Sequence, residues 1–417
     1  MTEGQQANRN QSSRKAVRWR GPVIGINEQG YQTPVFYDPH TSIAAGGQVG
    51  ASSSNGILIT GSPGSGKSFL GMTLATESTI EGKKTIFLDP KNDSLGMINL
   101  RDWMDNKITV WDINDKELAG SMDPFIFNKT IEQKISKAYA LINILLGPFN
   151  EKQDTLLYPI IQDIANEPKA SMNLLKMKLL RHSDYSINRL GTHLEAIQGS
   201  GNISDLIFGT VSKDTEIHQM EFNDGLTIIS TFGLELPKSA DPSTYQPKDK
   251  LSLGIMYLIC DFILAVMKDD KHKTEPKTVF IDEAWAVTAS AQGYRTVCEL
   301  LRLGRAFNLA VVLMTQNTSD LERDDGKQEL MNSVVTRFAF KCNEDKEAAI
   351  LCDSMGIGED YIPYFTRLRQ GECIMRDYKK RISQISIINQ FPEWAHAFET
   401  NPWKKAQQVQ AAKKAQS

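Results

Sequence analysis

Eight consecutive residues in the first quarter of the chain carry the clearest chemical pattern. They are Gly61, Ser62, Pro63, Gly64, Ser65, Gly66, Lys67 and Ser68. Their spacing, G-x-x-x-x-G-K-[ST], is that of a phosphate-binding loop, in which glycines let backbone N–H groups turn toward the phosphates. In this pattern Lys67 reaches the β- and γ-phosphates and Ser68 ligates Mg²⁺. The residues therefore predict a site for a nucleoside triphosphate with Mg²⁺.

Two adjacent acids supply the expected partner of such a loop. Asp282 and Glu283 directly follow the apolar run 278–281, which we expect to be a buried strand. Asp282 would hold the Mg²⁺ shell. Glu283, one residue further, would polarise the attacking water as a general base. The pair predicts hydrolysis rather than binding alone.

Two further polar residues follow predicted strands. Gln316 comes after the apolar run 309–314, and Asp89 after the run 85–88. The carboxyl ends of parallel strands open on one crevice, so Gln316 could bond the γ-phosphate or orient water. A structural role at the strand end is the alternative for both residues, and Asp89 belongs to no motif of its own.

Three arginines are candidates for a residue that neutralises charge on the γ-phosphoryl group. Arg302 and Arg305 lie on a predicted helical segment, and Arg337 lies further on. Such an arginine finger is often supplied by a neighbouring subunit. A helical arginine is more commonly a surface residue, so spacing alone does not choose among the three.

The segments that would position these residues indicate an α/β fold. Short apolar runs bounded by turns or helical segments are typical of buried parallel strands; they span 57–60, 85–88, 108–111, 226–230, 278–281 and 309–314. Two further strand-like runs, 23–26 and 34–37, precede a Gly/Ser/Ala-rich connector over 44–55. We therefore expect a mainly parallel central sheet.

A helical region interrupts this pattern. Between residues 123 and 224 the strand signal disappears and apolar residues recur at helical spacing. We predict an all-helical insertion over 126–223, flanked by an ATPase domain made of 21–125 and 224–403. The apolar stretch 251–267 is short and contains Ser252 and Asp261, so we interpret it as a buried helix rather than a membrane span.

Composition places the 417-residue chain among ordinary globular proteins, with 41% hydrophobic and 23% charged residues. The net charge of −3 conceals two basic ends, residues 1–20 and 404–417. We expect both to be solvated tails. The acidic remainder argues against a broad nucleic-acid surface. Five widely spaced cysteines without a Cys-x-x-Cys pair indicate neither a disulfide framework nor a zinc site.

Taken together, the motifs resemble the FtsK/HerA division of RecA-like P-loop motors, most closely the TraC/TrbE-like ATPases of conjugative type IV secretion. The resemblance covers about residues 21–403. It is carried, in chain order, by the phosphate loop, 89–91, 123–125, the helical insertion, 282–285, 302–305, 315–316, 332–341 and 371–377.

This resemblance implies a RecA-like α/β motor that hydrolyses ATP with Mg²⁺ and drives conjugative DNA transfer or type IV secretion. It implies a homo-hexamer, secretion-channel proteins as partners, and a cytoplasmic location with peripheral contact to the inner-membrane complex. It also places Arg305 where FtsK-type motors keep their trans finger. Conjugation ATPases usually carry a large N-terminal domain, whereas only a short segment precedes the phosphate loop here, so docking on the channel is in question.

Two other functions share these motifs. A DNA translocase, either an FtsK/HerA-like pump or a conjugative coupling protein, would make DNA a direct partner and would need a basic pore. An assembly scaffold would use ATP only as a structural ligand, which the intact Glu283 argues against.

Overall fold

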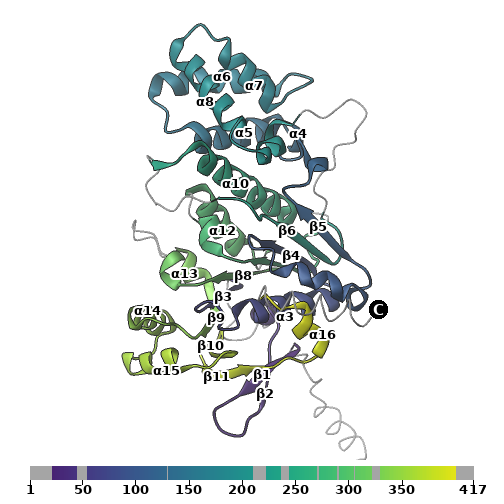
Figure 1. The fold of residues 1–417 in the computed structure, drawn as a ribbon, viewed down its shortest axis with the longest axis vertical. Helices are drawn as coiled ribbons and strands as arrows, with labels where there is room; N and C mark the ends of the chain where they lie inside the picture. Colours follow the sequence, from purple (N-terminus) through teal and green to yellow (C-terminus); the bar gives the residue numbers. More distant parts are fainter. Residues whose placement is uncertain are drawn as a thin grey trace, which may run out of the picture.

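The computed structural model describes residues 21–44, 54–128, 130–209, 222–235, 244–269, 272–288, 291–304, 306–321 and 329–400. Both predicted tails and most of the 44–55 connector lie outside these ranges. The described part is elongated (Figure 1), with a group of helices at one end and the antiparallel edge of a sheet at the other.

Within the described residues, eleven strands form one sheet in the order β2-β1-β11-β10-β9-β3-β8-β7-β4-β6-β5. The strands are β1 (Val23–Asn27), β2 (Pro34–Phe36), β3 (Gly56–Thr60), β4 (Lys84–Asp89), β5 (Ile108–Asp112), β6 (Leu226–Ser230), β7 (Lys277–Ile281), β8 (Leu309–Thr315), β9 (Val334–Phe340), β10 (Glu372–Arg376) and β11 (Ile382–Ile387). The strands from β9 to β5 are parallel, and β2, β1, β11 and β10 pair antiparallel. The expected α/β fold with a mainly parallel sheet is confirmed.

Strands β9, β10 and β11 are absent from the sequence-based prediction, which treated 332–341 and 371–377 only as motifs and made no prediction for the residues of β11. The hairpin turn between β10 and β11, residues 377–381, has the sequence Asp-Tyr-Lys-Lys-Arg. It contains no glycine or proline to signal a reversal of the chain. The β10–β11 hairpin was therefore not predicted, whereas β1 and β2 agree with the strand-like runs 23–26 and 34–37.

Helices cover both faces of the sheet. They are α2 (Thr41–Ala44), α3 (Lys67–Ile80), η1 (Ser94–Met104), α10 (Pro247–Lys268), α11 (Ala284–Thr288), α12 (Ala291–Leu303), α13 (Glu329–Ser333), α14 (Asp345–Met355), α15 (Ile362–Arg367) and α16 (Pro392–Ala397). Successive strand residues alternate between the faces. Ile57 and Ile59 pack with α3, η1 and α16, whereas Leu58 packs with α10 and α12. The parallel strands are thus buried on both sides, which explains their continuous apolar runs.

Helices α4 (Pro124–Phe127), α5 (Ile131–Leu146), α6 (Glu151–Ala165), α7 (Met172–Leu180), α8 (Tyr185–Gln198) and α9 (Asp205–Phe208) lie between β5 and β6. No strand occurs among the described residues from 113 to 225. Capping boxes at Thr130 and Asn150 start α5 and α6. The region is helical as expected, while its boundaries at 126 and 223 stay a prediction.

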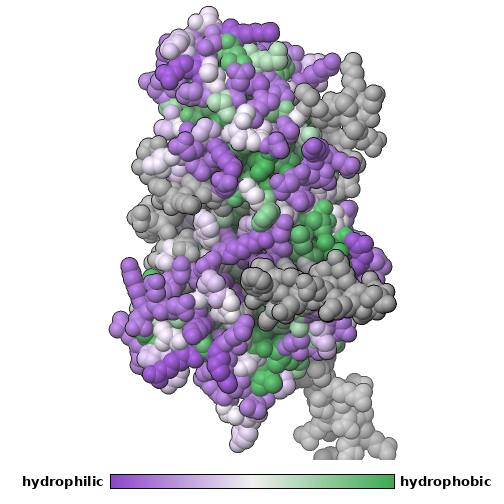
Figure 2. All heavy atoms as spheres, viewed as in Figure 1, coloured by the Kyte–Doolittle hydropathy of each residue, from purple (hydrophilic) through white to green (hydrophobic). Residues whose placement is uncertain are grey.

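Helix α10 is long and apolar enough to cross a membrane by length and composition. In the structure, 83% of its most apolar window is buried, between the sheet and the α5–α8 helices (Figure 1). Asp261 in its middle pairs with Lys137 of α5. The face drawn in Figure 2 is mostly hydrophilic, with hydrophobic residues in small groups. Stretch 251–267 is therefore a core helix, as predicted.

Candidate active site

The predicted phosphate loop connects β3 to α3, and its three glycines have backbone angles that favour glycine. The φ angles of Gly61, Gly64 and Gly66 are 150°, 75° and 116°. A Cβ added to Gly61 would lie 2.6 Å from Cβ of Phe340. Only glycine fits there, so the loop conformation depends on these positions.

Two neighbouring segments hold the loop in place. The backbone N–H of Ser62 donates to the carbonyl of Lys341 at 2.8 Å, just after β9. The N–H of Gly371, just before β10, donates to the carbonyl of Ser65 at 2.8 Å. The antiparallel end of the sheet thus supports the loop from one side.

Several polar groups of the loop fit an anionic ligand. The hydroxyl of Ser65 is buried and has no hydrogen-bond partner. Lys67 is buried, and its Nζ makes a long contact of 3.4 Å with the carbonyl of Ser62. Burial lowers the pKa of Lys67, while Glu283 and Asp282 oppose that shift. An unpaired donor and a poorly solvated cation beside the start of a helix suit a phosphate group.

Asp282 and Glu283 follow β7 at the same edge of the sheet, and both are buried. Burial, together with the charges of Glu283 and Asp89, raises the pKa of Asp282 to about 7. Glu283 has φ of 47°, a strained value for a residue with a side chain. Its N–H donates to Oδ1 of Asp282 at 2.9 Å. The two carboxylates are therefore fixed by the turn that ends β7.

Three side chains donate to the carboxylate of Glu283. Lys91, after β4, donates to Oε1. Gln316, after β8, donates to the same oxygen from Nε2 at 3.1 Å, and Nε1 of Trp285 donates to Oε2 at 2.7 Å. Burial alone would raise the pKa of Glu283, but the bonds from Lys91 and Gln316 lower it. The structure thus brings Gln316 to Glu283, since β4 and β8 flank β7.

Asp89 stabilises the turn that follows β4. It is fully buried and accepts hydrogen bonds from the N–H groups of Lys91 at 2.9 Å and Ser94 at 2.8 Å. Between the two alternatives left by its sequence, these bonds favour the structural role. Lys91 and Trp285 were not predicted as site residues, although the Asp-Pro-Lys sequence at a strand end in a parallel sheet was the available signal.

The three candidate arginines differ in their surroundings. Arg302 is exposed and pairs with Glu329. Arg337 is buried in β9, and its guanidinium donates to the carbonyl of Met331 at 3.0 Å. Arg305 lies outside the described residues. A finger role stays a prediction for each of them.

The sequence matches the AAA-like domain family over residues 34–398, and the chain belongs to this family. Among curated proteins it is 25% identical over 377 residues to the uncharacterized protein YddE of Bacillus subtilis, covering 82% of this chain and 42% of YddE. The chain therefore spans less than half the length of that relative.

Solved structures share the fold. VirB4 of Thermoanaerobacter pseudethanolicus superposes with a TM-score of 0.69 at 15% identity, covering 89% of this chain and 97% of VirB4. The plasmid coupling protein TrwB, solved in complex with ADP and Mg²⁺, gives 0.53 at 15% identity over 81% of this chain and 87% of its own.

Proposed function

We propose that the chain is a Mg²⁺-dependent ATPase motor that energises conjugative DNA transfer or type IV secretion. The observation that carries the proposal is the meeting of the phosphate loop, the Asp282–Glu283 pair and Gln316 at the carboxyl edge of one parallel sheet. Membership of the AAA-like family and the shared fold with VirB4 and TrwB support it.

Each residue of the site would have a separate task. The loop from Gly61 to Gly66 would wrap the phosphates with backbone N–H groups, and Lys67 would bond the β- and γ-phosphates. Glu283 would accept the proton of the attacking water. Gln316, already bonded to Glu283, would orient that water or sense the γ-phosphate.

Ser68 and Asp282 would hold the metal ion. Their oxygens suit Mg²⁺, which usually binds through one or two protein oxygens plus phosphates and water. The described residues contain no cluster of three or more His, Cys, Asp or Glu that could hold a metal without a nucleotide. Bound Mg²⁺ would neutralise charge on the transferred phosphoryl group.

Two substitutions test the proposed roles by different routes. We expect Lys67→Ala to lose both nucleotide binding and turnover, because the phosphate contact is gone. Glu283→Gln should bind ATP but turn over about 10² to 10⁴ times more slowly, since only the general base is removed. Binding and steady-state hydrolysis, measured with and without Mg²⁺, distinguish the two. Near wild-type turnover in Glu283→Gln would contradict the general-base role.

The proposed assembly is a homo-hexamer in which Arg305 completes a neighbour's site. An Arg305→Ala subunit still has Glu283, and a Glu283→Gln subunit still donates Arg305. Mixing the two variants should therefore recover part of the activity that each lacks. An inactive mixture that co-assembles on size-exclusion chromatography would make Arg302 or Arg337 the next candidate.

Partners and location follow from the same proposal. Secretion-channel proteins would hold the motor at the cytoplasmic face of the inner membrane as a peripheral subunit. Recovery of the motor in the membrane fraction of a strain with the channel proteins, and in the soluble fraction of a strain without them, would support this. A motor that stays in the soluble fraction in both strains would count against docking.

A direct DNA pump is the second candidate, because the fold is shared with the plasmid coupling protein TrwB. For a pump, double-stranded DNA should stimulate ATP turnover, and its affinity for the protein should fall as the salt concentration rises. A secretion ATPase that does not touch DNA should show neither effect.

A further inference from the structure

The side chain of Lys91 contacts the proposed general base from a neighbouring strand. It follows β4 by two residues, and β4 lies directly beside β7 in the sheet. The Lys91 backbone is fixed, since its N–H donates to Oδ1 of Asp89 at 2.9 Å. Its side chain is 46% exposed, whereas that of Glu283 is 5% exposed. The lysine can therefore swing away more easily than the glutamate can.

In this arrangement one oxygen of Glu283, Oε1, is fully engaged. Lys91 and Gln316 both donate to Oε1, and Trp285 donates to Oε2. A general base needs a free lone pair aimed at the water it deprotonates. With all three donors in place, Oε1 has no lone pair left for water, and Glu283 keeps only one, on Oε2.

The charges around the site indicate what could displace Lys91. The charges of Lys91, Asp282 and Glu283 all act on Lys67, so two cations and two anions share one region. A Mg²⁺-bound triphosphate brings net negative charge into that region and offers oxygens that compete with Glu283 for a lysine. A diphosphate lacks the terminal group.

We propose that Lys91 is a positioning residue that holds Glu283 in the absence of a triphosphate and releases it by turning to the γ-phosphate. This inference rests on the proposed function. It adds a reason why Glu283 stays paired with Lys91 until a triphosphate, rather than a diphosphate, is bound. Lys91 acts on the reaction through Glu283 and not as the base itself.

Trp285 offers a direct readout, because its indole N–H is bonded to Glu283. We would measure tryptophan emission of the wild type with no nucleotide, with Mg²⁺-ADP and with a Mg²⁺-bound non-hydrolysable ATP analogue. Only the analogue should shift the emission strongly. A Trp285→Phe variant should lack that shift, which assigns the signal to this residue.

Substitution of Lys91 should remove the discrimination. In Lys91→Met the difference in emission between analogue and ADP should fall at least about threefold. The ratio of analogue to ADP affinity should fall about tenfold, as expected for loss of one charge-assisted bond. Lys91→Arg should preserve both. The control is Lys83→Met, another lysine in an ion pair, which contacts Asp38 and Glu81 away from the site.

The outcomes separate this inference from the proposed function. Suppose that the wild type hydrolyses Mg²⁺-ATP, but Lys91→Met keeps the wild-type difference in emission and the wild-type ratio of affinities. The inference is then wrong and the proposed function stands. Equal weakening of analogue and ADP binding would also overturn it, because a structural role predicts that result. If the wild type neither binds nor hydrolyses Mg²⁺-ATP, the proposed function itself fails. Should Lys91→Met not fold, Lys91→Gln provides the same comparison.

Discussion

The two ends of the parallel strands both gather lysines and carboxylates, yet they use them differently. At the amino ends, Lys84 contacts Asp224 at 3.2 Å, Glu275 at 3.0 Å and Nδ1 of His272 at 2.9 Å. Lys277 is fully buried and donates to the carbonyls of His272 and Glu275. These cations have their partners within the fold. At the carboxyl ends, a buried hydroxyl is unpartnered and Lys67 has only a long contact.

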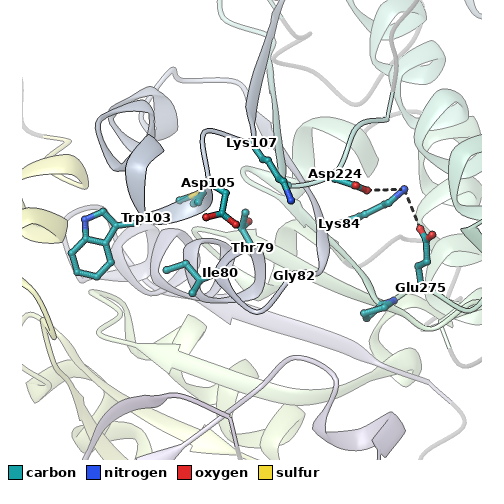
Figure 3. Close-up of a pocket in the computed structure, with 12 residues that line it drawn as sticks. Thr79, Ile80, Gly82, Lys84, Trp103, Asp105, Lys107, Asp224 and Glu275 are labelled. Atoms are coloured by element: carbon teal, nitrogen blue, oxygen red, sulfur yellow. Dashed lines mark ion pairs between the residues drawn. The ribbon is translucent and has the colours of Figure 1, made fainter.

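A cavity also lies at the amino ends, away from the phosphate loop. It has a volume of about 300 Å³ and is lined by Lys84, Lys107, Asp224 and Glu275 among others. Figure 3 shows Lys84 between the two carboxylates. Charge and hollow space alone therefore do not define the proposed active site. What distinguishes the carboxyl edge is the run of three positive-φ glycines leading into α3, together with a buried lysine, Lys67, whose only hydrogen bond within the described residues is one long contact.

The largest expected effect comes from comparing one lysine substitution at each edge of the sheet. Lys67→Met should lower ATP turnover by about 10² to 10³ with little change in melting temperature, because one preorganised phosphate donor is lost. Lys277→Met should change the melting temperature but keep turnover per folded molecule within about threefold. Hydrolysis and thermal unfolding measured on both variants test this. The reverse result would make the amino edge the active one.

A substitution at the carboxyl edge should trade function for stability. Asp282 has a raised pKa in the folded chain, so its ionised form is penalised and stability falls as pH rises from about 4 to 7. Asp282→Asn removes that penalty. Without nucleotide, the variant should gain about 1 kcal/mol in free energy of unfolding at pH 8 and little at pH 4. Denaturant titrations at both pH values check the gain, and a loss of stability at pH 8 would contradict it.

Lys277 should produce the opposite pH dependence. Burial lowers its pKa to about 8, so above pH 8 the unfolded chain binds more protons than the folded one. Stability of the wild type should therefore rise between pH 8 and 10 relative to Lys277→Met, by about 1 kcal/mol. Free energies of unfolding measured side by side for the two proteins and plotted against pH should then converge or cross. A constant difference over this range would show that Lys277 stays charged.

The smallest effect is expected at the amino-edge cavity. Lys107→Ala should leave turnover and nucleotide affinity within about twofold, since this residue contributes to the cavity and not to the phosphate loop. A large loss of nucleotide affinity would indicate that the nucleotide binds in the cavity instead of at the phosphate loop.

Much of the carboxyl edge could be predicted from sequence because its residues lie in short motifs next to apolar runs. The phosphate loop, Asp282 and Glu283 each follow a strand directly, and the parallel order brings their ends together. Lys91 could not be paired with Glu283 in this way, since 192 residues separate them and either could have turned to solvent. Strand β11 was missed because most of its residues are only partly buried, and the buried strand β10 was missed because no glycine or proline marks the turn that follows it.

Helix α10 belongs to one continuous apolar cluster with α5–α8 on one side and the sheet on the other, and the Lys137–Asp261 pair crosses the first of these contacts. Because neither side can lose α10 without exposing a wide apolar surface, the helical region and the sheet should melt in a single cooperative transition. Amide protons of α5 and of the central strands should then exchange with solvent through the same global opening. Nucleotide bound at the sheet would slow exchange in a helix that it never touches.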